Sequence, residues 1–343
     1  GEHQKAVSCY EKAIEINPNH ADAHSNLGIL LNQLGEHQKA VSCYEKAIEI
    51  NPSHANAYNN LGNTFNYLGE HQKAVGCYKK VVQINPNYAG PYNNLGDTFR
   101  ELGEPQKAIS CYEKAIQIEP DNLTSNWLLM NTFPVIYKDF KEIDHYRKRF
   151  ENSIKKINQL LDIQTQYKKK QLIDAISSST NFYLHYQGED DLELQKSYAY
   201  LIERITQKTY REFHKKPKKN LSSQKIKVGF LSSFVRKHTV SKLFKNWIIR
   251  LDKKYFEKYV YYVDNKVDQI TNEIKQNVNY FFHELDVDKL IKKISQDNLD
   301  VLIYLDIGMK PKIQILSSLR LAPIQCNTCC LLYTSDAADD VRG

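Results

Sequence analysis

The sequence predicts an α-solenoid of helical repeats followed by an α/β domain with a parallel sheet. Three observations support this prediction. A 34-residue pattern recurs over the first third of the 343-residue chain, it stops after Pro120, and from Ile226 short apolar segments alternate with helical ones. Repeats of this length stack into solenoids, and strands that alternate with helices favour a parallel sheet of Rossmann type.

The repeated unit contains two helical patterns, for example Ala55–Leu68 and Glu70–Ile84, with Gly69 in the turn between them and Pro86 after the second. The recurring positions are Gly1, Gly35, Gly69 and Gly103; Ala6, Ala40, Ala74 and Ala108; Tyr10, Tyr44, Tyr78 and Tyr112; and Pro18, Pro52, Pro86 and Pro120. The pattern resembles the tetratricopeptide repeat. We expect one isolated second helix (1–17), three whole repeats (18–119) and a closing helix from Pro120. Because one helical hairpin cannot bury its apolar face alone, the units must stack.

One asparagine recurs at the same position of each first helix, as Asn26, Asn60 and Asn94. An amide both donates and accepts hydrogen bonds, so a ladder of asparagines along an inner groove could bind a peptide backbone without reading its sequence. The alternative is that these side chains cap or bridge adjacent repeats. The sequence predicts peptide-binding residues here and leaves the alternative open.

Composition narrows the class of protein. No run approaches eighteen apolar residues, so we expect no membrane span. Cys9, Cys43, Cys77 and Cys111 share one repeat position and are expected to be small buried apolar residues, which is compatible with a reducing, cytoplasmic setting. The pair Cys326 and Cys329 has no partner pair, so no metal site is expected.

The net charge of +7 comes from the residues after the repeats, because residues 1–137 carry more acidic than basic side chains. The basic residues after the repeats could bind phosphates, or they could belong to lysine-rich helices exposed to solvent. No RNA-binding motif accompanies the charge, so we expect no nucleic-acid partner.

Four segments are predicted. They are the repeat arm (1–137), a helical linker (138–220), an α/β segment (221–329) and a tail (330–343). The predicted strands are Ile226–Leu231, Tyr259–Val263, Tyr280–Leu285, Val301–Leu305 and Ile324–Gln325, and the predicted helices are Ser241–Leu251, Asp268–Asn277, Asp288–Gln296 and Lys312–Leu319. Ligands of such sheets gather at the carboxyl ends of the strands. A GxGxxG or Walker lysine motif is absent from the sequence, which disfavours a classical dinucleotide or ATP site.

Several motifs of the later segments resemble O-linked N-acetylglucosamine transferases and their bacterial relatives. They are Gly229–Ser233, His238–Val240 with Lys242 and Leu243, Tyr304–Met309 and Arg320–Cys326, together with Trp127, Tyr146–Phe150 and Thr180–Gly188 in and near the linker. With the repeats, the resemblance covers residues 1–329. Leu305 stands where relatives often have proline.

The resemblance implies a GT-B fold of two Rossmann-like lobes. It also implies inverting, metal-independent transfer without a cofactor from a UDP-sugar, usually UDP-N-acetylglucosamine, to Ser or Thr of acceptor proteins, or to Asn in some bacterial branches. The resemblance gives His238 and Asp306 catalytic roles. An imidazole can position or deprotonate an acceptor. The alternatives are a helix-capping or surface histidine for His238, and a cap on the following helix for Asp306.

A Trp-Gly-His-Pro motif that follows in the family is absent, as is everything beyond it. We therefore expect a fragment without the nucleotide-binding second lobe, inactive by itself, with His238 and Asp306 facing solvent. Residues 330–343 have the composition of a translated sequencing adapter and are excluded from the fold; the alternative is a natural polar tail. A competing functional hypothesis is a non-catalytic tetratricopeptide adaptor that binds peptides.

Overall fold

The computed structural model describes residues 2–163, 167–218 and 225–328. The chain divides into two compact units, Gly1–Lys138 and Asp139–Gly343. Among the described residues, none of the helices combines the length and the apolar character that crossing a bilayer requires. The expected tail, 330–343, lies outside the described residues.

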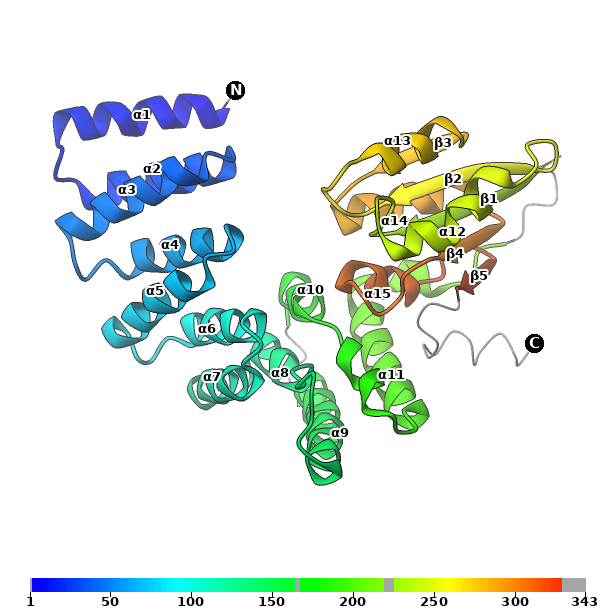
Figure 1. Cartoon of the computed structure of the whole chain (residues 1–343), viewed down its shortest axis with the longest axis horizontal. Coiled ribbons are helices and arrows are strands. Elements are labelled where there is room, and N and C mark those ends of the chain that lie inside the picture. Colours follow the sequence, from blue (N-terminus) through cyan, green and yellow to red (C-terminus); the bar gives the residue numbers. More distant parts are fainter. Residues whose placement is uncertain (1, 164–166, 219–224, 329–343) are drawn as a thin grey trace. The chain divides into compact units, whose positions relative to one another are not determined.

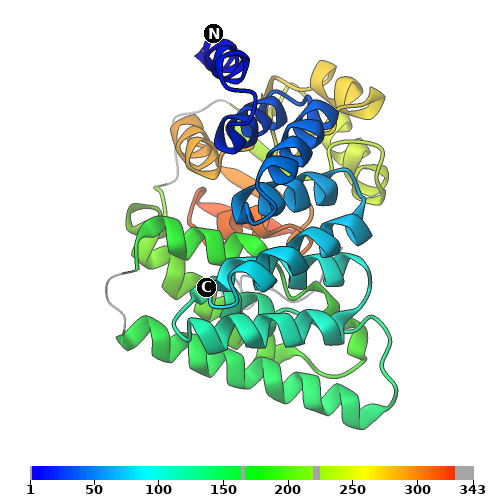
Figure 2. The same ribbon diagram turned by 90° about the vertical axis from the view of Figure 1, so that its left-hand side faces the viewer.

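The first unit consists of helical hairpins stacked on one another, as Figures 1 and 2 show. Its helices are α1 (Glu2–Ile16), α2 (Ala21–Gln33), α3 (His37–Ile50), α4 (Ala55–Tyr67), α5 (His71–Ile84), α6 (Ala89–Glu101), α7 (Pro105–Ile118) and α8 (Leu123–Met130). The prediction of one isolated second helix, three repeats and a closing helix is confirmed. A single apolar core runs along the stack, with Tyr44, Tyr78 and Tyr112 at equivalent positions.

Two sets of glycines allow this stacking. Gly35, Gly69 and Gly103 adopt φ values of +82°, +78° and +73° in the turns inside the hairpins, where other residues would be strained. A second set, Gly28, Gly62 and Gly96, lies against the rings of Tyr44, Tyr78 and Tyr112, and a Cβ atom on any of the three would approach a ring carbon to within 2.5–2.8 Å. The absence of a side chain at the second set therefore lets the two helices of each hairpin pack closely.

The first helices form the inner layer of the stack. α2 contacts α4 and α4 contacts α6, whereas the second helices α3, α5 and α7 contact one another less. In a curved stack the helices on the concave side approach each other more closely. The side chains of α2, α4 and α6 that point away from the second helices therefore line the inner groove.

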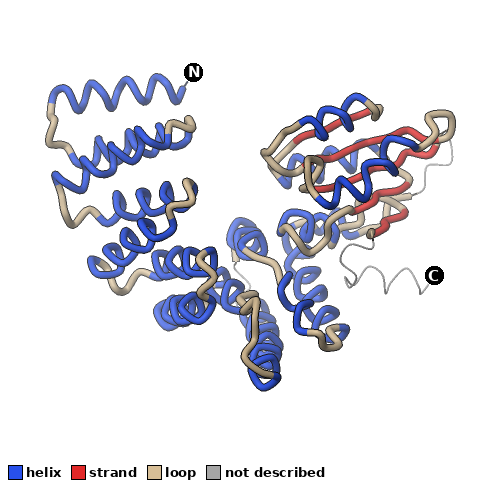
Figure 3. Tube along the Cα trace, in the orientation of Figure 1, coloured by secondary structure: helices blue, strands red, loops and turns tan. Residues whose placement is uncertain are grey.

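The second unit joins a helical segment to a sheet (Figure 3). The helical elements are α9 (Phe140–Ile163), α10 (Lys169–Ser178), the 3-10 helix η1 (Phe182–Gln187), α11 (Leu192–Thr209) and the 3-10 helix η2 (Arg211–His214). Gln314 of the sheet region donates through Nε2 to the hydroxyl of Tyr198 on α11 at 3.1 Å. The segment expected to be a linker thus packs on the sheet and belongs to the same compact unit.

The sheet has five parallel strands in the order β3-β2-β1-β4-β5. Its elements are β1 (Ile226–Ser232), α12 (Thr239–Arg250), β2 (Phe256–Tyr262), α13 (Gln269–Gln276), β3 (Tyr280–His283), α14 (Val287–Asp297), β4 (Val301–Tyr304), α15 (Pro311–Ser317) and β5 (Ile324–Asn327). Every predicted strand and helix of this segment is present, and the predicted α/β fold class is confirmed.

Helices cover the sheet on both faces. Val228 and Phe230 of β1 pack in one core with Phe244 and Ile248 of α12 and Ile274 of α13. Right-handed crossovers place α14 and α15 on the other face, because the chain returns from β3 to β4 on the far side of β1. The strand order reverses between β1 and β4, and the carboxyl ends of these two strands lie side by side. Ligands of doubly wound sheets bind at this kind of position.

Candidate functional site

His238 lies in the loop that follows β1, at the N-terminus of α12. Its Nδ1 accepts a hydrogen bond from the backbone N–H of Val240 at 3.3 Å, so the side chain caps the helix. The imidazole also stacks on the ring of Phe234, with ring centroids 4.0 Å apart and planes inclined by 16°. The helix-capping role, which the sequence left open as an alternative for His238, is present in the structure.

The cap determines which nitrogen of His238 is available. Because Nδ1 accepts a bond from an N–H group, the neutral ring carries its proton on Nε2. Partial burial lowers the pKa of His238, and the positive charge of Arg236 lowers it further. The ring is therefore neutral near pH 7 and presents Nε2–H as a donor. In this arrangement it can position a substrate oxygen, but it has no free basic nitrogen.

Asp306 follows β4 and lies at the point where the strand order reverses. Its two carboxylate oxygens accept hydrogen bonds from the backbone N–H of Ser233, at 3.1 and 3.2 Å. Burial raises the pKa of Asp306 to about 7, although hydrogen bonds from Ser232 and Ser233 and the charge of Lys310 act in the opposite direction. The carboxyl group links the ends of β1 and β4.

This environment differs from both expectations for Asp306. The side chain is 1% exposed, so the expectation that it faces solvent is wrong. It does not cap the following helix either, since Lys310 occupies the residue before α15. The physical reason is that β4 lies directly beside β1, and the N–H group of Ser233 after β1 needs an acceptor.

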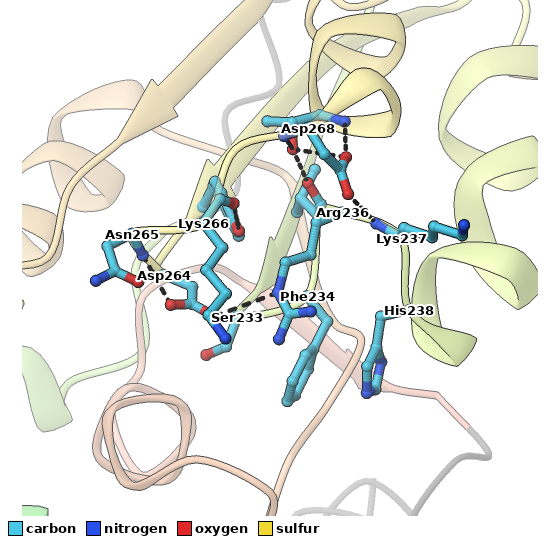
Figure 4. A network of polar contacts seen from close by, with 12 residues as sticks. Ser233, Phe234, Arg236, Lys237, His238, Asp264, Asn265, Lys266 and Asp268 are labelled. Carbon is cyan, nitrogen blue, oxygen red and sulfur yellow. Dashed lines mark hydrogen bonds and ion pairs between the residues drawn. The ribbon is translucent and has the colours of Figure 1, made fainter. Parts of the chain in front are cut away.

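A cavity of about 540 Å³ lies beside His238, between the first two turns of α12 and the first turn of α13. It is lined by Arg236, Lys237, His238, Ser241, Lys242, Lys245, Asn246, Asp268, Gln269 and Ile270. Figure 4 shows how these loops are held: Arg236 bonds to Asp264, and the backbone N–H of Lys237 donates to Asp268 at 2.6 Å. Lys245 pairs with Glu273 at 2.9 Å.

The lining of this cavity is positively charged. It contains four Lys or Arg side chains and one carboxylate. Within the described residues, the side chains of Lys237 and Lys242 take part in none of the ion pairs or hydrogen bonds. The cavity therefore suits a ligand that carries hydrogen-bond acceptors or negative charge. These cations were not predicted, although the run Arg236-Lys237-His238, shortly after the predicted strand Ile226–Leu231, was a visible signal.

The three ladder asparagines are half-buried on the first helices, which form the inner layer. Asn94 donates through Nδ2 to Oδ1 of Asn59 in the preceding repeat, at 3.0 Å. This contact is the bridging alternative that the sequence left open, at one of the three positions. Side-chain hydrogen bonds of Asn26 and Asn60 do not occur among the described residues.

Two further polar contacts join the first helices of neighbouring repeats and were not predicted. Asn93 donates to Ser125 at 2.9 Å, and Asn66 donates to Thr98 at 2.7 Å, each between neighbouring repeats. The signal for Asn93 was the dipeptide Asn59-Asn60, which recurs 34 residues later as Asn93-Asn94. In the inner layer, Asn66, Asn93 and Asn94 therefore bridge neighbouring repeats, whereas the side chains of Asn26 and Asn60 form no such bridge among the described residues.

The residues described here do not bring three His, Cys, Asp or Glu side chains together as a metal ion requires. Cys326 belongs to β5, and Cys329 lies outside the described residues.

Comparison with known proteins supports the fold of each segment. A tetratricopeptide repeat profile matches residues 1–53, 19–87 and 53–120. The arm is built of tetratricopeptide repeats. A Thermobaculum terrenum O-GlcNAc transferase mutant has a similar structure, with a TM-score of 0.57 and 15% sequence identity, over 91% of this chain and 51% of that one. This chain thus spans about half the length of that protein, and the likeness concerns the fold.

Two smaller repeat proteins match less of the chain. MamA of Desulfovibrio magneticus RS-1 is 20% identical over 48% of this chain and 89% of that one, with a TM-score of 0.42. YrrB, described as a tetratricopeptide protein with an unusual peptide-binding site, is 16% identical over 59% of this chain and 93% of that one, with a TM-score of 0.39. A search of curated proteins found no match.

Proposed function

We propose that the chain is the acceptor-selecting arm and first catalytic lobe of a protein glycosyltransferase. The observation that carries the proposal is the order of parts: tetratricopeptide repeats, then a helical segment packed on a 3-2-1-4-5 parallel sheet, matched over 91% of the chain by an O-GlcNAc transferase. The acceptor is a Ser or Thr hydroxyl of a protein, and the donor is a UDP-sugar, UDP-N-acetylglucosamine being the first to test.

The chemistry that the first lobe would supply follows from the site. Inverting transfer needs an acceptor oxygen held in line with the anomeric carbon, removal of the acceptor proton, and stabilisation of the leaving diphosphate. His238 would hold the acceptor or a sugar oxygen through Nε2–H, as a positioning donor. Asp306 would act indirectly, by fixing the loop of Ser233 that leads to His238. The diphosphate would be bound by a second lobe.

The test is sugar transfer by the longest protein that the gene encodes. With UDP-[¹⁴C]N-acetylglucosamine and a protein acceptor, we expect label in the acceptor, and we expect about a 10- to 100-fold loss of kcat/KM in His238→Ala. His145→Ala, on the exposed side of α9, is the control and should retain activity. The 343-residue chain alone should give no turnover.

One observation favours a second candidate, a non-catalytic peptide-binding adaptor. Neither His238 nor Asp306 offers a free basic atom, because one caps a helix and the other is buried. If the longest protein binds peptides but transfers no sugar from any of several UDP-sugars, the adaptor is the correct function.

The asparagine ladder gives a prediction shared by both candidates. Replacing Asn26 and Asn60 by alanine should weaken binding of an extended acceptor protein about 10-fold, because two amides that are free to bind a peptide backbone are lost. Isothermal titration of the chain with an acceptor protein measures this. Adding Asn94→Ala should also lower the stability of the arm by about 1 kcal/mol, since the bond to Asn59 is lost.

The matched control for the ladder carries Lys46→Ala, Lys80→Ala and Lys114→Ala. These exposed side chains recur at the same 34-residue spacing on the second helices α3, α5 and α7. The control should bind normally. Equal weakening in both sets of variants would mean that the inner groove is not the place where acceptors bind.

A further inference from the structure

A second basic cavity lies in the helical segment. It has a volume of about 740 Å³ and is bounded by α10, the end of α11 and η2. Its lining residues are Tyr167, Lys169, Leu172, Arg204, Gln207, Lys208, Arg211, His214 and Lys215. Five of them are Lys or Arg, and none of these lining residues is Asp or Glu. The proposed sugar transfer gives this cavity no role.

Three of the five cations have partners within the protein. Lys169 pairs with Asp288 at 2.9 Å and lies 4.2 Å from the ring centroid of Tyr210. Arg204 pairs with Asp162 at 2.5 Å. Lys208 donates to the backbone carbonyl of Leu161, in the last turn of α9, at 3.1 Å. The first contact joins α10 to α14 of the sheet region, and the other two join α11 to the C-terminal turn of α9. Each of these three cations therefore has a structural role.

The other two cations, Arg211 and Lys215, have no such explanation. Both are exposed at the cavity, and within the described ranges neither side chain forms an ion pair or a hydrogen bond. Holding them near three further cations costs Coulomb energy that an anion in the cavity would recover. Contacts among the described residues therefore do not account for this concentration of positive charge.

The start of α10 adds to the positive potential. Lys169 and Leu172, from its first turn, line the cavity. The preceding residue, Lys168, has a side chain without an acceptor atom, so it cannot cap the N–H groups of that turn. Uncapped N–H groups at the start of a helix attract phosphates. Here they lie beside the cations already described.

We propose that this cavity binds a compact polyphosphate, a ligand with two or more linked phosphate groups. Arg211 and Lys215 would be the main ligands, since their charges are unpaired. Lys208 and Lys169 would add weaker contacts from positions already fixed. The volume is within the range of small-molecule sites, which leaves room for either an inorganic chain or a nucleotide whose base lies near Tyr167 and Leu172.

Isothermal titration of the 343-residue chain with sodium tripolyphosphate in 150 mM NaCl tests the proposal. We expect saturable binding with one site, and at least 10-fold weaker binding of inorganic monophosphate. Arg211→Glu combined with Lys215→Glu should weaken tripolyphosphate binding at least 10-fold. The matched control is Lys216→Glu combined with Lys218→Glu, which makes the same charge change in the same exposed segment outside the cavity lining.

Each outcome decides the proposal. Loss of binding in the first double variant, with the control within 2-fold of the wild type, supports it, provided that circular dichroism shows both variants folded. No saturable binding, or equal weakening in both variants, overturns it, since equal weakening means diffuse attraction by surface charge.

A parallel titration with ATP separates the two sources of such a ligand. Tighter binding of ATP than of tripolyphosphate indicates a nucleotide, and equal or weaker binding indicates an inorganic chain. Because sugar transfer is not measured, the outcome is independent of the proposed function.

Discussion

Gly96→Ala should lower the free energy of unfolding of the repeat arm by about 1–3 kcal/mol, although it adds only one methyl group. A Cβ atom at this position would lie 2.5 Å from Cε1 and 2.8 Å from Cζ of Tyr112. The ring cannot move away easily, because Tyr112 is fully buried and its hydroxyl donates to Asp97 at 2.8 Å. The helices α6 and α7 must therefore separate, and the loss of packing exceeds the gain in helix propensity.

A second glycine provides the control with the opposite sign. Gly76 lies inside α5, where a Cβ atom would meet nothing within 4 Å. Gly76→Ala should therefore stabilise the arm by about 0.5–1 kcal/mol, the ordinary difference in helix propensity. If Gly96→Ala also stabilises the arm, the close approach of the two helices is not as tight as described here.

Urea unfolding followed by tryptophan fluorescence measures both variants. The chain has two tryptophans. Trp127 is buried in α8 of the arm, and Trp247 is exposed on α12 of the sheet unit. In a Trp247→Phe background the signal comes from the arm alone. The midpoint should move to lower urea for Gly96→Ala and to higher urea for Gly76→Ala, with unchanged slopes.

The fold could be predicted from the sequence because its determinants are local or periodic. The 34-residue spacing shows the hairpins directly, and the turn glycines such as Gly69 adopt the positive φ that the pattern predicts. The alternation of apolar and helical segments also located every strand. Each of these signals lies within one repeat or one strand–helix unit, and none depends on knowing which distant segments are neighbours.

The environment of the candidate residues could not be predicted in this way. The burial of Asp306 follows from β4 lying beside β1, and the sequence does not specify the strand order. The bridge from Asn94 to Asn59 depends on how successive repeats are offset. The cap formed by His238 was foreseen as an alternative, because it depends only on residues next to it in the chain. Contacts between segments far apart in the sequence determine the burial and protonation of these side chains, and the sequence alone does not reveal those contacts.

Asp306→Asn should make the sheet unit more stable at pH 8 and remove part of its pH dependence. The ordinary pKa of this side chain is 3.8, and burial raises the pKa to about 7 in the folded protein. The folded protein therefore holds the proton of Asp306 more tightly than the unfolded chain does. The stability that this proton contributes is complete below pH 3.8 and is lost as the pH rises through 7.

The size of the effect follows from the same linkage. Between these two pKa values, Asp306 should lower the free energy of unfolding by about 1.4 kcal/mol for each pH unit. Asparagine is neutral at every pH and keeps one oxygen to accept the N–H of Ser233, but it loses the second. We therefore expect the variant to be more stable than the wild type by about 2 kcal/mol at pH 8, and less stable or equal at pH 4.

Asp268→Asn is the control for this prediction. Burial alone would raise the pKa of Asp268, but hydrogen bonds from the backbone N–H groups of Lys237, Thr271 and Ile270 outweigh it and lower the pKa. Its contribution to stability is thus lost as the pH falls, the opposite of Asp306. Asparagine is also a good N-cap, so this variant should keep the wild-type loss of stability between pH 4 and pH 7.

Urea unfolding at pH 4, 6 and 8 distinguishes the two carboxylates. In a Trp127→Phe background, Trp247 reports on α12, where its ring lies 5.2 Å from that of Phe244. The wild type and Asp268→Asn should lose stability as the pH rises from 4 to 8, and Asp306→Asn should lose much less. Parallel pH profiles for all three proteins would mean that Asp306 is ionised throughout this range. Asp306 would then be a permanent negative charge bonded to the N–H of Ser233, the residue that follows β1. Because His238 lies in the same loop as Ser233, the positioning role proposed for the histidine would have to include that charge.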